Sequence, residues 1–166
     1  MRKLVTVFVA HSSKDERLIH PIANILRWIG VEPYLAGLED PVPIPLPAKL
    51  DRAIGSSVAM FAFLTPNVAE DRRTRDVVNW EISSAYAKRK PIYVFAEKGV
   101  NIPLMINYIT VYATYDPMDQ ESLDRMTDRV RQIADEFKKI EDIAKAAFNL
   151  VLLFLGLWFL RSLSTD

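Results

Sequence analysis

The chain has 166 residues, half of them hydrophobic, which suits one compact domain with a short additional segment. Its 21 basic and 21 acidic residues cancel, so the composition lacks the basic field that nucleic-acid-binding proteins carry. The absence of cysteine excludes disulfides, thiolate nucleophiles and Cys-based zinc sites, and only His11 and His20 remain as other soft metal ligands. We therefore predict neither a nucleic-acid partner nor a bound metal.

The first predicted element is an apolar run at residues 5–10. A basic opening followed by such a run also fits the core of a secretory signal, but the run is at the short limit for one. We favour a buried strand, because a helix start follows directly. Ser13, with Glu16 three residues on, predicts an N-cap, and Gly30 predicts the end of that helix.

The rest of the chain alternates short apolar runs with longer periodic segments, which is typical of β-α units. The further predicted strands are residues 31–35, 58–64, 92–95 and 109–112, and the further predicted helices are 46–57, 74–90 and 121–140. We predict an α/β fold, a flavodoxin-like open parallel five-stranded sheet in the order 2-1-3-4-5, flanked by helices. Ligands of such sheets bind beyond the carboxyl ends of the strands.

Glu81 stands out on the predicted helix 74–90. Side chains three and four residues apart face each other on a helix, and at those positions Glu81 has two valines, a serine and an alanine. The nearest cation on that face is Lys88, two turns away. Glu81 is either a solvated surface glutamate or a functional carboxylate.

Other candidates lie near the expected carboxyl edge of the sheet. His11 fits a packed residue at a strand end or a base, and Ser12 and Ser13 fit helix caps or donors to a ribose or phosphate. Asp40 belongs to a proline-rich loop, "EDPVPIPLP", that we expect to form a stiff lid. The segment "TPNVAEDRRTRD" is expected to be a charged, exposed loop whose arginines could also meet a pyrophosphate.

Three stretches together resemble Toll/interleukin-1 receptor (TIR) domains of the prokaryotic branch. They are "VFVAHSSKDERLIHPIANILRWIGVEPYLA", "RAIGSSVAMFAFLTPN" and "NWEISSAYAKRKPIYVF", within residues 3–115. The resemblance implies a catalytic glutamate on the third helix, which is Glu81 here. It also implies NAD⁺ as a substrate, with no separate cofactor, and homo-oligomers formed through TIR–TIR contacts. The family often has a tryptophan four residues before that glutamate, whereas this sequence has Val77 there and a tryptophan at Trp80.

The resemblance therefore implies an NAD⁺ nucleosidase, a glycohydrolase or cyclase that releases nicotinamide, is activated by self-association and acts in defence or cell-death signalling. Glu81 is the predicted catalytic residue. The predicted substrate-binding residues are His11, Ser12, Ser13, Asp40 and Trp80. The alternative is a non-enzymatic TIR signalling adaptor or oligomerisation scaffold, and a nucleotide sensor without turnover is a third possibility.

The C-terminal segment is strongly apolar, since only Asn149 interrupts residues 146–160. We predict a TIR domain at residues 1–140 and a hydrophobic C-terminal helix at 141–166. This helix could anchor the protein in a membrane through residues 143–163, form a helical bundle between subunits, or fold back on the domain. We expect the anchor, with Lys138, Lys139 and Lys145 holding the TIR domain on the cytoplasmic side.

Overall fold

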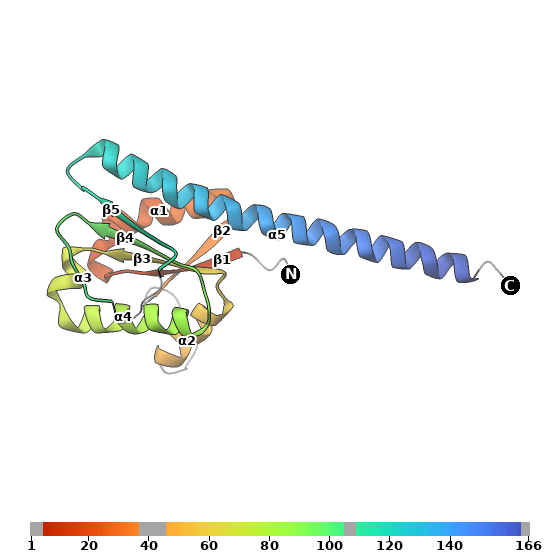
Figure 1. The fold of residues 1–166 in the computed structure, drawn as a ribbon, viewed down its shortest axis with the longest axis horizontal. Coiled ribbons are helices and arrows are strands. Elements are labelled where there is room, and N and C mark those ends of the chain that lie inside the picture. The colour runs from red at the N-terminus through yellow and green to blue at the C-terminus, as the bar shows by residue number, and fades with distance from the viewer. Residues whose placement is uncertain (1–4, 37–45, 105–108, 164–166) are drawn as a thin grey trace.

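In a computed structural model, the chain forms one five-stranded parallel sheet in the order β2-β1-β3-β4-β5. The structure describes residues 5–36, 46–104 and 109–163, without the side chains of 46 and 156–163. The strands are β1 (Val5–Ala10), β2 (Val31–Leu35), β3 (Ala59–Leu64), β4 (Ile92–Glu97) and β5 (Val111–Tyr115). The predicted fold class and strand order are confirmed (Figure 1). The carboxyl ends of all five strands therefore lie at one edge.

Helices cover both faces of the sheet (Figure 1). One face carries α1 (Glu16–Ile29) and α5 (Gln120–Leu163), and the other carries α2 (Leu46–Ser56), α3 (Pro66–Glu70) and α4 (Arg72–Ala87). Alternate residues of β3 feed the two cores, so Phe61 and Phe63 face α1 and α5 while Met60 and Leu64 face α4. All six residues of β3 are fully buried, as expected for a central parallel strand.

The start of α1 differs from the prediction of a Ser13 cap. A short 3₁₀ helix, η1 (Ser13–Asp15), comes first, and the hydroxyl of Ser12 accepts a hydrogen bond from the amide of Lys14. Asp15 occupies the N-cap position of α1 but makes no capping bond. The reason is that its carboxylate accepts bonds from Thr65 Oγ1 and Asn67 Nδ2, both at 2.6 Å. Ser13 is exposed.

The segment after β3 is helical, which corrects the prediction of a charged loop. Thr65 caps α3 by accepting a bond from the amide of Val68, and Asp71 caps α4 by accepting one from the amide of Thr74 at 3.0 Å. Two capping side chains six residues apart thus open two helices in succession. As a result α4 begins at Arg72, two residues before the predicted start.

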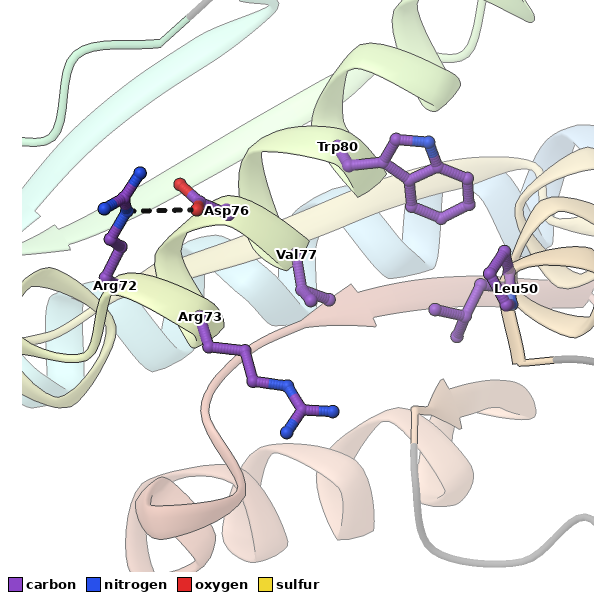
Figure 2. A pocket seen from close by; sticks show the side chains of 7 residues that line it. Leu50, Arg72, Arg73, Asp76, Val77 and Trp80 are labelled. Carbon is purple, nitrogen blue, oxygen red and sulfur yellow. Dashed lines mark ion pairs between the residues drawn. The ribbon is translucent and has the colours of Figure 1, made fainter.

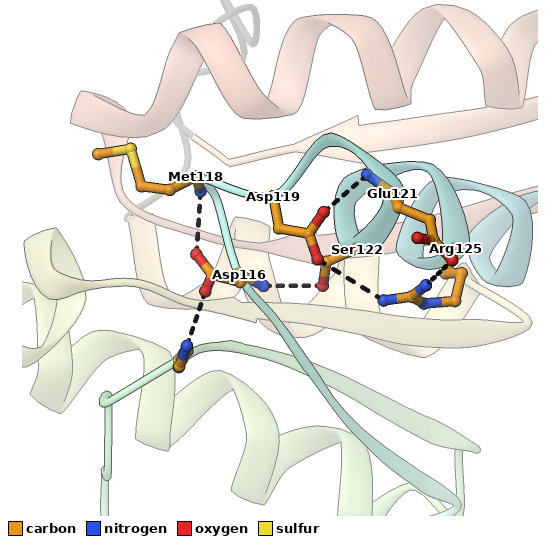
Figure 3. A network of polar contacts seen from close by, with 7 residues as sticks. Asp116, Met118, Asp119, Glu121, Ser122 and Arg125 are labelled. Carbon is orange, nitrogen blue, oxygen red and sulfur yellow. Dashed lines mark hydrogen bonds and ion pairs between the residues drawn. The ribbon is translucent and has the colours of Figure 1, made fainter.

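β5 and the start of α5 are held by a polar network. Asp116 accepts bonds from Lys98 Nζ at 2.8 Å and from the amide of Met118, and its own amide donates to Ser122 Oγ (Figure 3). Asp119 accepts the amide of Glu121 at the first turn of α5. The turn that follows β5 therefore fixes the direction in which α5 leaves the sheet.

α5 runs as one helix from Gln120 to Leu163, so the apolar segment is not a separate C-terminal helix. The prediction of a membrane anchor, and of a membrane-bound location, is wrong for the described part of the chain. There, no helix is long and apolar enough to cross a bilayer.

Candidate functional site

Glu81 lies on the buried side of α4. Only 2% of its surface is exposed, and Val78, Ile82 and Ala85 on the same helix are equally buried against the sheet. Among the described residues, no hydrogen bond or ion pair reaches its carboxyl group. The cation that the sequence placed nearest, Lys88, binds Asp51 of α2 at 3.0 Å instead. Glu81 is therefore not a solvated surface glutamate.

Burial dominates the electrostatics of Glu81. Removal from water penalises the charged form and raises the pKa of Glu81 to about 8. The carboxyl group is therefore mostly protonated at neutral pH in the isolated subunit. A strongly shifted carboxyl without a structural partner is a common feature of functional sites.

A pocket of about 710 Å³ lies between α2 and α4. Its lining residues are Pro47, Leu50, Arg72, Arg73, Asp76, Val77 and Trp80. Figure 2 shows Leu50 on one side and the α4 side chains on the other, with the charged residues gathered at one end. The pocket thus combines an apolar wall with a cationic end. Glu81 is not among its lining residues, although Val77 and Trp80, one turn before and directly before it, are.

Trp80 shows where the aromatic side chain of this site lies. Val77 and Trp80 are 39% and 40% exposed, and both line the same pocket. They share one face of α4 because they are three residues apart. Trp80 therefore gives this wall of the pocket an aromatic surface next to Val77.

The three arginines near the start of α4 have different environments. Arg72 Nε lies 3.8 Å from Asp76, and the side chain of Arg73, which also lines the pocket, points away from this pair (Figure 2). Arg75 donates instead to the carbonyl of Ala69 at 3.0 Å and so joins α3 to α4. Arg72 and Arg73 also border a second hollow of about 420 Å³ with Lys14 and Asn67. The sequence suggested all three arginines as contacts to a pyrophosphate, whereas in the structure only Arg72 and Arg73 line the pocket.

His11, Ser12 and Ser13 follow β1 and do not line the pocket in the described structure. The ring Nδ1 of His11 lies 2.9 Å from the carbonyl of Val9, and burial lowers the pKa of His11, which favours the neutral ring. Ser12 is buried and caps η1. Asp40 lies outside the described residues. Of the predicted substrate contacts, Trp80 alone is brought to this pocket in the part of the chain that is described.

Asp15 is a residue of this edge that sequence reasoning missed. It is 7% exposed, and its bonds to Thr65 and Asn67 join the loop after β1 to the loop after β3. Its position in "AHSSKD", directly after a buried strand, was the available signal. The described residues contain no cluster of three or more acidic, histidine or cysteine side chains that could hold a metal ion.

The fold and site define an α/β domain in which one helix, α4, carries both the wall of a partly apolar pocket and a buried carboxyl group. The sequence profile of the TIR domain family matches residues 7–127, which is most of the chain. The chain therefore belongs to the TIR domain family. Among curated proteins, no sequence matches it significantly.

Solved structures with a similar fold include the CMP N-glycosidase BcmB of Clostridium botulinum. It is 21% identical, with a TM-score of 0.54 over 73% of this chain and 96% of the other. The flavodiiron core of Flv1 from Synechocystis sp. PCC6803 is 14% identical, with a TM-score of 0.49 over 81% of this chain and 36% of the other. The 2-desoxiribosyltransferase of Leishmania mexicana is 15% identical, with a TM-score of 0.43 over 74% and 97%. These likenesses concern the fold.

Proposed function

We propose that this TIR domain is an NAD⁺ nucleosidase that releases nicotinamide, with Glu81 as the catalytic residue. The observation that carries the proposal is a buried carboxyl group without a partner among the described residues, on the helix whose Val77 and Trp80 line a pocket of about 710 Å³. The similar fold of a CMP N-glycosidase is compatible with this chemistry, but at 21% identity the argument depends on the site itself. NAD⁺ is the substrate, and no further cofactor is required.

The pocket fits the parts of a dinucleotide. Trp80 offers an aromatic surface for a base or nicotinamide ring, and Leu50 and Val77 supply apolar walls. Arg73 in the pocket lining can pair with a pyrophosphate, which matches its planar guanidinium group. Ser12, Ser13 and Asp40 remain proposed contacts to the substrate, and the neutral ring of His11 better fits a packing role.

The chemistry requires the ionised form of Glu81. When the bond between ribose C1′ and the nicotinamide nitrogen breaks, its electron pair leaves with nicotinamide, which departs as a neutral molecule. Positive charge develops on the ribose, and a carboxylate beneath it stabilises the oxocarbenium ion until water or an internal adenine nitrogen attacks. The cationic nicotinamide ring itself favours the carboxylate, because an opposite charge lowers the pKa of an acid.

Burial of Glu81 also gives a reason for control by assembly. In the isolated subunit the carboxyl group is covered and mostly protonated at neutral pH. A rearrangement that exposes Glu81 to the pocket therefore has to accompany activity, and TIR–TIR contacts are our proposed source of it. This agrees with a role in defence or cell-death signalling, in which activity follows recruitment.

The same burial favours a second candidate function. A glutamate that does not line the pocket in this structure is also compatible with a TIR adaptor that recruits other TIR domains without turnover. The two functions differ in product formation, so one assay separates them.

The test is nicotinamide release from NAD⁺ by the concentrated full-length protein, followed by chromatography between pH 6.5 and 8.5. We expect release to increase with pH, because the free protein ionises Glu81 only near pH 8. Glu81→Gln should reduce the rate at least about 100-fold, since it removes the charge that stabilises the transition state.

The matched control is Glu136→Gln, which changes an exposed glutamate of α5 and should leave the rate unchanged. Release that persists in Glu81→Gln would show that the site is assigned to the wrong residue. If no nicotinamide appears under conditions in which the protein self-associates, the adaptor is the better description.

A further inference from the structure

The second half of α5 has no partner in the described chain. Up to Phe137 the helix packs on α1 and the sheet, with Met126, Val130, Ile133 and Ala134 buried. Beyond it the helix continues away from the domain (Figure 1). Every residue from 142 to 155 is exposed.

The exposed half repeats the pattern of the buried half. Met126, Val130, Ile133 and Phe137 follow one another at spacings of four and three residues, and the same spacing continues at 140, 144, 147, 151 and 154. Such a 3-4 repeat is the seam of helices that pack in coiled coils or bundles. This row of apolar residues is therefore suited to pack against another helix. In the first half of α5 the row already packs against α1.

The exposed apolar surface is large enough for a stable interface. Nine large side chains between 140 and 155 are 51–72% exposed: Ile140, Ile143, Phe148, Leu150, Val151, Leu152, Leu153, Phe154 and Leu155. Together they present on the order of 1,000 Å² of apolar surface, against about 800 Å² that each partner contributes to a standard interface. Residues 150–155 are consecutive, so they surround the helix. One neighbouring helix covers one side of such a surface, whereas in a bundle of three or more copies each helix contacts two neighbours and a larger share of the surface is covered.

The charges before this segment favour a parallel arrangement of copies. Lys138 lies 2.6 Å from Asp142, Lys139 lies 2.7 Å from Asp135, and Lys145 lies 2.8 Å from Glu141. Because these three ion pairs lie within one helix, the charges of this part of α5 are neutralised within each copy. Parallel copies can therefore place these charged turns side by side without repulsion between like charges. An antiparallel copy would place its apolar segment against these charged turns and remove their charges from water.

We propose that residues 140–155 of α5 form a parallel bundle with the same segment of at least two further copies of this chain. The bundle is a self-association surface separate from the TIR domain, and its existence does not depend on the proposed NAD⁺ chemistry. It holds several TIR domains at one end of the assembled helices.

The first experiment measures the mass of the full chain in detergent-free buffer by light scattering across micromolar concentrations. We expect at least three times the chain mass of 19.0 kDa. The double variant Leu150→Glu with Phe154→Glu should reduce the mass to that of one chain, because both positions are exposed and their glutamates repel between copies. The control Met118→Glu, at a position 94% exposed outside the segment, should keep the assembly.

The second experiment tests the direction of the helices. The chain has no cysteine, so Ile140→Cys, on the 3-4 seam and near one end of the segment, should form a disulfide between copies only if they run parallel, with their Cα atoms within about 7 Å. Glu136→Cys, on the half of α5 that covers the domain, should remain monomeric under denaturing conditions after oxidation.

Three results would overturn the proposal. They are a wild-type chain that stays monomeric, a double variant that keeps the assembly, and a failure of Ile140→Cys to cross-link. A chain that is monomeric in buffer and floats with phosphatidylcholine vesicles would show that lipid, and not another copy, covers the segment.

Discussion

The burial of Glu81 lowers the stability of the folded protein. A carboxyl group with 2% exposure and no partner in the described structure contributes no hydrogen bond that would offset its desolvation. An apolar or amide side chain at this position would be easier to bury. Proteins retain such residues chiefly where the group has a function, because strain and unsatisfied polarity concentrate at active sites.

The raised pKa of Glu81 predicts the pH dependence of stability. The unfolded state releases this proton near pH 4.5 and the folded state near pH 8, so the folded state binds more protons between these values. Stability therefore decreases as pH increases through this window. Between pH 5 and 8 we expect a loss of roughly 3 kcal/mol from this group alone. Glu81→Gln should remove that slope and be more stable than wild type at pH 8.

Urea unfolding of the two proteins at several pH values measures this difference, with Glu136→Gln as the control. If the free energy of unfolding depends on pH equally in wild type and Glu81→Gln, the carboxyl group ionises normally in the folded protein. Burial would then not support a functional role of Glu81.

At the scale of elements, a polar bridge joins the two helices that form the pocket. Asp51 of α2 accepts bonds from Ser84 Oγ at 2.9 Å and Lys88 Nζ at 3.0 Å, both on α4. Ser84 lies three residues after Glu81, and Leu50, beside Asp51, lines the pocket. The bonds from Lys88 and Ser84 lower the pKa of Asp51, which keeps the bridge charged at neutral pH. This bridge therefore links the two helices that line the pocket.

We predict that Asp51→Ala weakens substrate binding more than it slows chemistry. Without Asp51, α2 loses its polar link to α4, so KM for NAD⁺ should increase several-fold while kcat changes little and Tm falls only slightly. The control is Asp135→Ala, which removes a carboxylate whose partner, Lys139, lies on the same helix, so no link between elements is lost. An unchanged KM in Asp51→Ala would show that the bridge does not shape the pocket.

At the scale of the whole molecule, α5 connects the domain to a self-association surface. The helix is anchored on α1 and β5 and continues well beyond them (Figure 1). If the exposed half gathers several copies, their TIR domains reach a high effective concentration without further contacts. Weak TIR–TIR contacts then suffice to form the active arrangement.

This coupling predicts that activity depends on protein concentration. The rate of nicotinamide release per chain should increase with concentration and reach a plateau once the assembly forms. In Leu150→Glu with Phe154→Glu, the increase should shift to at least roughly tenfold higher concentration, because tethering is lost. Met118→Glu should follow the wild type. A rate per chain that is constant over the whole range would contradict activation by assembly.

The sequence by itself determined the fold and the principal candidate residue. Alternation of apolar runs with amphipathic segments specified the parallel sheet and its order, because burial on both faces requires dense apolar strands such as residues 59–64. The sequence also showed which residues surround Glu81 on its helix, because helix geometry brings side chains three and four residues apart onto the same face.

Only the tertiary structure decided what depends on contacts distant in sequence. It paired Lys88 with Asp51 across two helices, drew the carboxylate of Asp15 away from capping to Thr65, and directed Arg73 to the pocket. It also showed that the apolar segment continues α5 as one helix, whereas the sequence analysis had placed a boundary after residue 140. Local sequence patterns indicate the periodicity and the helix or strand propensity of a segment. The partner of a charged side chain depends instead on which elements the fold brings together.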